Sequence, residues 1–293
     1  MHASGPDAGR TPSFKSPPHG CDSHFHVFGP ASKYPYGSDL RYKPPLAPLS
    51  EFRTLLETFG LERMVFVQPS AYGFDNSCML DAMREVGTAS CRGVVDFDET
   101  TISKRELAEM DRLGVRGIRV NVSPIKQYEA GFADRMVPRI ERLGRVAADL
   151  GWHLDFLTPG WLIAELMPTM LKLPVDYTIA HMGIYPAKDG PGQKGFQEFL
   201  DFVRNRTDRA WVKLTGAYRI SQAPELADVA PLAKALIAAI PDRMIWGSDY
   251  PHLSFADKVG SIQLWNLLGA WAPDETSRRK ILADNPARLF GFK

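Results

Sequence analysis

The sequence lacks two features that would place it in a membrane or in a disulfide-bonded secreted class. A membrane-spanning helix needs about 18 or more consecutive apolar residues, and no segment of the 293 residues approaches that length. The three cysteines, Cys21, Cys78 and Cys91, are widely spaced and form no CxxC pair. We therefore expect no disulfide framework, and a cytoplasmic location.

An excess of charge of one sign is also missing. The formal net charge is +1, with 35 basic and 34 acidic side chains, so nothing in the charge suggests nucleic acid or an anionic membrane as a partner. The N-terminal segment is polar, rich in proline and glycine, and without the apolar core of a secretory signal. We interpret residues 1–18 as a mobile arm able to pack on the surface, and residues 19–293 as a single domain.

Short apolar segments alternate with segments of helical spacing, several of which end in glycine. This alternation predicts a parallel sheet, and eight strands predict closure into a (β/α)8 TIM-type barrel. The rival, an open doubly wound sheet, is disfavoured because no GxGxxG or P-loop follows the first strand. The predicted strands are Cys21–Phe28, Arg63–Gln68, Cys91–Phe97, Gly117–Val122, Trp152–Leu157, Asp176–Met182, Ala210–Gly216 and Arg243–Asp249.

Four side chains at strand ends form the candidate catalytic set. Barrel enzymes carry their chemistry at the C-terminal ends of strands. His24 and His26 are two residues apart and so share one face of the first strand, while His181 ends the sixth strand and Asp249 the eighth. Taken singly, an HxH pair is a weak signal and a strand-end aspartate is often a helix cap. The ordered set is more specific. His153 begins its strand and belongs to the opposite, structural end.

Five more side chains are candidates for binding substrate, and each has a structural alternative. A charged residue on a buried strand needs a partner, which favours a functional role for Arg119. Gln68 could instead satisfy backbone groups, Arg219 could be solvated, His252 could cap a helix, and Tyr42 could pack within the long loop from Gly29 to Ser50. The candidate set is Arg119, Gln68, Tyr42, Arg219 and His252.

Six segments resemble amidohydrolase-related lactonases, in particular the 2-pyrone-4,6-dicarboxylate lactonases: DSHFHVFGP, FVQPSAYGFDN, LGVRGIRVN, GWHLDF, IAHMG and IWGSDYPH. They occur in the same order across residues 18–293. The resemblance implies a hydrolase that opens a small carboxylated lactone, with Asp249 as the general base on water. It further implies that His24, His26 and His181 polarise the lactone carbonyl, directly or through a metal, and that Arg119 holds a carboxylate.

Two departures from the resembling lactonases bear on the substrate. Ile184 stands where those enzymes have an arginine, and Leu157 stands where they have a tyrosine, although Lys126 could replace part of the lost charge. Fewer cationic groups imply fewer substrate carboxylates. We therefore expect a muconolactone-type compound or a sugar lactone rather than the pyrone dicarboxylate.

The cofactor and the reaction class stay open between alternatives. Three histidines and an aspartate can bind zinc or manganese. The resemblance implies that relatives with two metals carry a bridging lysine where this chain has Arg119, so we expect no tightly bound metal or one divalent cation. The alternative function is a metal-dependent decarboxylase of an aromatic or unsaturated acid. A catalytically inactive binder is disfavoured because the acid–base positions are filled, and a homo-oligomer is compatible with the sequence.

Overall fold

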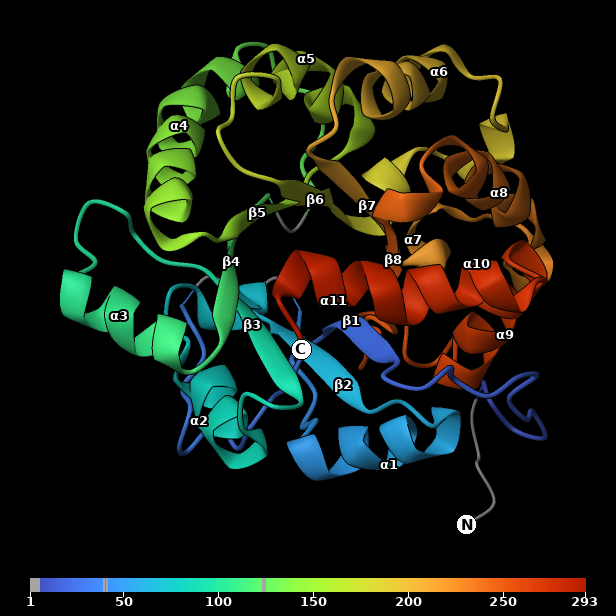
Figure 1. The fold of residues 1–293 in the computed structure, drawn as a ribbon, viewed down its shortest axis with the longest axis horizontal. Coiled ribbons are helices and arrows are strands. Elements are labelled where there is room, and N and C mark those ends of the chain that lie inside the picture. Colours follow the sequence, from blue (N-terminus) through green and yellow to red (C-terminus); the bar gives the residue numbers. More distant parts are fainter. Residues whose placement is uncertain (1–5, 39, 41, 123–124) are drawn as a thin grey trace.

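The computed structural model describes residues 6–38, 40, 42–122 and 125–293, and it confirms the barrel. Eight parallel strands pair in chain order and form a ring with the helices outside it (Figure 1). Each observed strand overlaps its predicted segment, and all strand residues are buried except Arg116 and Asn121 of β4, as expected for strands covered on both faces. The strands are β1 (Cys21–Phe25), β2 (Arg63–Val67), β3 (Cys91–Val95), β4 (Val115–Asn121), β5 (His153–Leu157), β6 (Tyr177–Ile179), β7 (Ala210–Leu214) and β8 (Met244–Trp246).

The helices follow from local sequence signals. Ser103 and Glu106 form a capping box at the start of α3, and α1 and α4 end at Gly60 and Gly151, which adopt the left-handed conformation that glycine accepts without strain. The helices are α1 (Leu49–Phe59), α2 (Ser77–Val86), α3 (Lys104–Arg112), α4 (Phe132–Leu150), α5 (Gly160–Met170), α6 (Lys194–Asp201), α7 (Ala217–Ile220), α8 (Ala230–Ala239), α9 (Ser261–Trp271), α10 (Glu275–Arg279) and α11 (Asn285–Phe290).

The C-terminal segment covers the N-terminal end of the barrel. The last helices cross the middle of the ring in Figure 1, and Phe290 packs edge-on against His153 at a ring-centroid distance of 5.3 Å. The Arg92 Nε donates to the Phe290 carbonyl at 2.9 Å. The prediction that His153 lies at the structural end is thus confirmed, and the opposite end is left as the mouth of the barrel.

The described part of the predicted N-terminal arm, residues 6–18, lies against α9. The Asp7 carboxylate accepts the backbone N–H groups of Ile262 and Gln263 at 2.9 and 3.0 Å. Phe14 stacks on Trp265 with ring centroids 4.4 Å apart. These contacts tie the arm to the first turn of α9, where free N–H groups favour a carboxylate.

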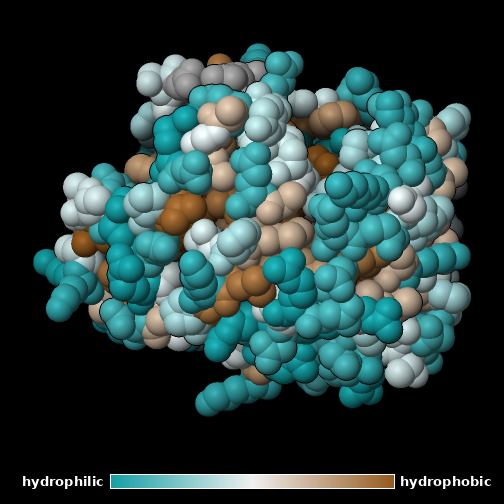
Figure 2. Space-filling view, turned by 90° about the horizontal axis from the view of Figure 1, so that it is seen from above, coloured by the Kyte–Doolittle hydropathy of each residue, from teal (hydrophilic) through white to brown (hydrophobic). Residues whose placement is uncertain are grey.

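The surface of the molecule carries both polar and apolar residues. In the face shown in Figure 2, hydrophilic residues predominate and apolar residues form small patches between them. Among the described residues, every helix is too short or too polar to cross a membrane.

Hydrogen bonds between β1 and the segment after β8 close the barrel. The Asp249 N–H donates to the His24 carbonyl, and the His26 N–H donates to the Tyr250 carbonyl, both at 2.8 Å. The buried Asp22 carboxylate accepts the N–H groups of His24 and Ser248, each at 3.1 Å. This carboxylate therefore joins the two edges of the sheet directly below the strand ends that carry the predicted site.

We expect Asp22→Leu to destabilise the fold by about 2–5 kcal/mol, because it leaves two buried N–H groups without their acceptor. Burial raises the pKa of Asp22 to about 7. Ionisation of this carboxyl therefore lowers stability as pH rises from its unfolded pKa of about 4 towards 7.

Asp22→Asn is the matched control, because an amide oxygen still accepts both N–H groups and does not ionise. Thermal unfolding measured at about pH 5 and about pH 8 checks the prediction. The melting temperature of Asp22→Asn relative to the wild type should be higher at the upper pH. Equal losses for the leucine and asparagine variants would contradict the role of Asp22 as an acceptor.

Candidate active site

The four predicted catalytic side chains meet at the mouth of the barrel. The Nε2 atoms of His24 and His26 each lie 3.4 Å from Asp249 Oδ1, and His181 Nε2 lies 3.7 Å from Asp249 Oδ2. All four side chains are almost completely buried. His181 and Asp249 adopt φ angles of 53° and 56°, a conformation that costs free energy for residues other than glycine and is common at functional sites.

The second oxygen of Asp249 is held by α7, the short helix that follows β7. The Tyr218 hydroxyl donates to Asp249 Oδ2, and the Arg219 Nε donates to the same atom at 3.3 Å. Arg219 was expected as a substrate ligand or a solvated loop residue, and the structure pairs it with Asp249. Tyr218 was not predicted, since its sequence signal is only its place next to Arg219 in the segment LTGAYRIS.

The pKa values of the clustered side chains indicate which of them are charged. Burial raises the pKa of Asp249, but positive charge at His181 and Arg219 lowers it more, and the net pKa lies well below its usual value. Because burial keeps His181 itself neutral at neutral pH, Arg219 is the charged group that acts on Asp249 there. Burial also lowers the pKa values of His24 and His26, and lowers that of His181 to about 3. At neutral pH the cluster is thus a carboxylate surrounded by neutral imidazoles and held by one guanidinium group.

A second ionic group lies under the histidines, inside the barrel. The register of the sheet places Arg119, Asp155 and Thr178 side by side on β4, β5 and β6. The Lys213 ammonium on β7 contacts Asp155 Oδ1 at 2.8 Å and His24 Nδ1 at 3.2 Å. Thr178 also donates its hydroxyl to Asp155.

Sequence reasoning missed Lys213 and Asp155, although a signal was present. Each is a charged residue in the middle of a largely apolar strand segment, WHLDFL or AWVKLTG. A buried charge is costly without a partner. Two opposite charges on two buried strands could therefore have been paired with each other before the structure was known.

The predicted substrate-binding side chains lie around the mouth, with different partners. Arg119 is buried and donates Nη1 to the Gln68 carbonyl. Its Nε makes no hydrogen bond among the described residues but pairs with Asp155 Oδ2 at 3.9 Å. The Gln68 amide nitrogen donates to the carbonyls of Gly73 and Asp75. The structural alternative, satisfying backbone groups, therefore holds for that nitrogen.

The remaining two candidates also have protein partners. The Tyr42 hydroxyl lies 3.3 Å from Ser70 Oγ, and the His252 Nε2 lies 2.8 Å from Ser261 Oγ at the start of α9. His252 is buried and its Nδ1 has no hydrogen bond among the described residues. Lys126, the expected replacement cation, is exposed and lies over the Phe132 ring.

Three of the clustered residues are close enough to hold a metal ion. One ligand atom each of His24, His26 and Asp249 lies within 4.8 Å of the others. His26 suits a metal ligand, because its Nδ1 donates to the Val67 carbonyl at 2.7 Å and leaves the Nε2 lone pair free. His24 does not fit, because its Nδ1 faces the Lys213 ammonium, which has no acceptor.

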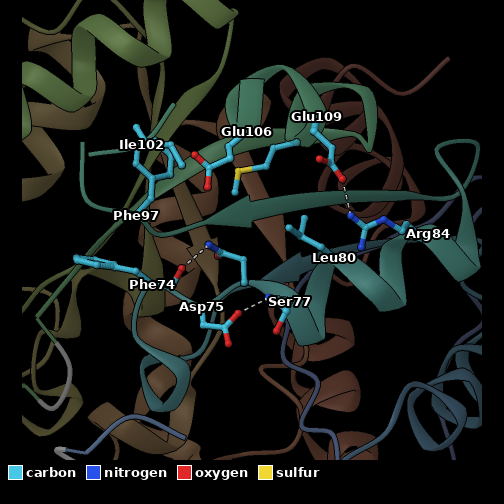
Figure 3. A pocket seen from close by; sticks show the side chains of 11 residues that line it. Phe74, Asp75, Ser77, Leu80, Arg84, Phe97, Ile102, Glu106 and Glu109 are labelled. Carbon is cyan, nitrogen blue, oxygen red and sulfur yellow. Dashed lines mark hydrogen bonds and ion pairs between the residues drawn. The ribbon is translucent and has the colours of Figure 1, made fainter. Parts of the chain in front are cut away.

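A separate cavity of about 300 Å³ lies in the outer layer between α2 and α3 (Figure 3). Its polar groups already have partners, since Glu109 pairs with Arg84 at 2.7 Å and Glu106 belongs to the α3 capping box. None of its lining residues belongs to the Asp249 cluster. The chemistry therefore points to the barrel mouth.

Comparisons with known proteins agree with this geometry. A model of the amidohydrolase family matches residues 21–292. The 4-sulfomuconolactone hydrolase of Hydrogenophaga intermedia is 38% identical over 95% of this chain and 90% of its own length. The 2-pyrone-4,6-dicarboxylate hydrolase of Comamonas testosteroni is 32% identical over 95% of this chain and 92% of its own.

A solved structure gives the same result. The putative 2-pyrone-4,6-dicarboxylic acid hydrolase of Pseudomonas putida superposes with a TM-score of 0.81 at 32% identity, covering 94% of this chain and 98% of the other. The resemblance drawn from the six sequence segments is thereby confirmed at the level of the family.

Proposed function

The chain belongs to the amidohydrolase family, and from that premise we propose that it is a hydrolase that opens a small carboxylated lactone. One observation carries the proposal. Asp249 Oδ1 and His24 Nε2 are buried, 3.4 Å apart, and neither makes a hydrogen bond among the described residues. An acceptor for a water proton thus lies beside a donor for a carbonyl oxygen, which is the pair of groups that ester hydrolysis requires.

In the proposed reaction, Asp249 takes a proton from water as the water oxygen attacks the lactone carbonyl carbon. Histidine N–H groups stabilise the negative charge that develops on the carbonyl oxygen. When the tetrahedral intermediate collapses, the ring C–O bond breaks and the proton passes from Asp249 to the leaving oxygen. No step in this sequence requires a metal, because a lactone is already an activated ester.

The low pKa of Asp249 makes it a weak base until substrate binds. Arg219 donates to Asp249 Oδ2 from a partly exposed position at the mouth. A substrate carboxylate that competes for this guanidinium group would remove a positive charge from Asp249 and raise its pKa. Binding of the correct anionic substrate would in this way increase the basicity of the carboxylate.

We propose a substrate with few anionic groups. The relatives act on lactones that carry sulfonate or carboxylate groups, according to their names. Ile184 and Leu157 provide no charge at the positions where the resembling lactonases have polar residues. This favours a muconolactone-type or sugar lactone, used in the cytoplasm, where the three free, buried cysteines would stay reduced.

The test is turnover of a lactone panel by purified protein, with and without chelator treatment, together with measurement of metal content. The panel contains a muconolactone, a sulfonated muconolactone, a sugar lactone and the pyrone dicarboxylate. We expect chelator-resistant hydrolysis that is fastest on a muconolactone. The alternative is a metal-dependent decarboxylase, which the close approach of His24, His26 and Asp249 favours. It would be established if no lactone is opened and if the protein releases CO₂ from an unsaturated acid only when zinc or manganese is present.

The pH dependence of kcat/KM should show a plateau from about pH 5 to about pH 8. A carboxylate base works above its pKa, and the pKa of Asp249 is well below its usual value, so the loss of activity should occur only in strong acid. His181, with a pKa of about 3, stays neutral throughout.

Two carboxyl groups near the site could mimic a catalytic titration, Asp22 with a pKa of about 7 and Asp96 with a pKa of about 6. Profiles should therefore be measured on the wild type, on Asp22→Asn and on Asp96→Asn. A step near neutral pH that persists in both variants would contradict the assignment of a fully ionised Asp249 and neutral imidazoles.

A further inference from the structure

The buried lysine on β7 contacts one histidine of the site and none of the others. Lys213 has no exposed surface, and its ammonium lies 2.8 Å from Asp155 Oδ1 and 3.2 Å from His24 Nδ1. Burial raises the pKa of Asp155, but Lys213 and Arg119 lower it to about 2, so this carboxyl is ionised. Burial lowers the pKa of Lys213 from its usual value, and the ionised Asp155 carboxylate 2.8 Å away acts in the opposite direction and holds the group as an ammonium.

The contact with Lys213 determines which nitrogen of His24 carries the proton. An ammonium group donates three hydrogen bonds and accepts none, so His24 Nδ1 must offer its lone pair. A neutral imidazole has one N–H, which must then lie on Nε2, the atom that faces Asp249.

His26 has the opposite arrangement. Its Nδ1 faces the Val67 carbonyl at 2.7 Å, and a carbonyl only accepts. The proton of a neutral His26 therefore lies on Nδ1, and its Nε2 presents a lone pair towards Asp249 Oδ1. The two histidines of the HxH pair thus offer different groups to the same space, a donor from His24 and an acceptor from His26.

We propose that Lys213 is a positioning residue that holds His24 in the Nε2–H tautomer, so that His24 donates a hydrogen bond to the substrate and is unfit to bind a metal ion. The identification of the lactone carbonyl oxygen as the atom that receives this hydrogen bond rests on the proposed function. The tautomer and its consequence for metal binding rest on the geometry alone.

This arrangement gives water and the lactone carbonyl oxygen different hydrogen-bonding partners in the site. A water molecule needs acceptors for its protons, which Asp249 Oδ1 and His26 Nε2 supply. A carbonyl oxygen needs donors, which His24 Nε2–H supplies. A metal ion at the same place would require a lone pair from His24 Nε2, and the ordinary second partner of a metal-bound histidine is an acceptor rather than an ammonium.

The tautomers can be observed directly in protein labelled with 15N in its seven histidines. Long-range proton–nitrogen spectra distinguish a protonated from an unprotonated ring nitrogen, and His24→Gln and His26→Gln identify the two sets of signals. We expect Nε2–H for His24 and Nδ1–H for His26 in the wild type. A wild-type His24 that carries its proton on Nδ1 would overturn the proposal without any variant of Lys213.

The variant that tests Lys213 is the double change Lys213→Met and Asp155→Asn, which removes both charges of the Lys213–Asp155 pair together. Arg119, whose Nε lies 3.9 Å from Asp155 Oδ2, keeps Asp249 and Asp96 as nearby carboxylates in this variant. Lys234→Met, on the exposed face of α8, is the control. In the double variant we expect His24 to shift towards the Nδ1–H tautomer. We also expect Co²⁺, followed by its visible absorption, to bind at least about tenfold more tightly than in the wild type.

Activity supplies an independent readout. The double variant should lose about 10–100-fold in kcat on a lactone with little change in KM, because the donor acts mainly on the developing oxyanion. An unchanged His24 tautomer in the folded double variant would overturn the role of Lys213. If the tautomers are as expected and no lactone is opened, the proposed function fails while the positioning role of Lys213 stands.

Discussion

Asp249→Asn is expected to lower kcat/KM for lactone hydrolysis by roughly 10³–10⁴-fold, because an amide cannot accept the proton of the attacking water. The substitution preserves the size of the side chain. Its amide oxygen can still accept from Tyr218, which holds Asp249 Oδ2 in the wild type. The loss should therefore appear in catalysis in a folded protein.

The measurement is initial rate against lactone concentration, with circular dichroism and thermal unfolding on the same samples. Asp257→Asn is the matched control, because Asp257 lies in the same segment between β8 and α9 and is exposed. It should keep wild-type rates. A folded Asp249→Asn enzyme that retained more than about a tenth of the activity would remove Asp249 from the role of base.

Arg119→Gln is expected to raise KM by about 10–100-fold with a smaller change in kcat. A charge-assisted hydrogen bond to a carboxylate contributes about 1.5–3 kcal/mol. The buried Nε of Arg119 has no hydrogen bond among the described residues, and the nearest carboxylate oxygen, Asp155 Oδ2, lies 3.9 Å away. Asp155 keeps the Lys213 ammonium as its partner in this variant, so the charge under the site stays compensated.

The control is Arg116→Gln, three residues earlier on β4, where the guanidinium contacts Asp111 away from the site. A sharper test uses the lactone and its uncharged amide analogue with both enzymes. The wild type should prefer the carboxylate, and Arg119→Gln should lose most of that preference. If KM and the preference are unchanged, the carboxylate binds elsewhere, and Arg219 at the mouth becomes the next candidate.

Sequence reasoning was accurate where the physical signal is local. The strand segments are short and apolar because both faces of each strand are covered, and the helices end at glycines such as Gly60 and Gly151. The gathering of His24, His26, His181 and Asp249 followed from one topological rule, that parallel strands bring their C-terminal ends to one edge.

Sequence reasoning could not predict which groups the long polar side chains of the site would contact. Gln68 was a candidate for binding substrate, with the satisfaction of backbone groups as its alternative, and its nitrogen binds the carbonyls of Gly73 and Asp75. Arg219 was expected to be a ligand or a solvated residue, and its partner is Asp249. Which acceptor a long polar side chain meets depends on loop conformation, and the sequence pattern carries no information about that.

By itself, the sequence determined the number and order of the strands, the end of the barrel at which each candidate residue lies, and the family. These properties depend on hydrophobic periodicity, glycine positions and order along the chain. The tertiary structure alone decided the protonation state of Asp249 and the placement of Lys213 between Asp155 and His24. Protonation and tautomer depend on burial and on distances of a few ångströms between strands far apart in sequence, and only the closed barrel sets those distances.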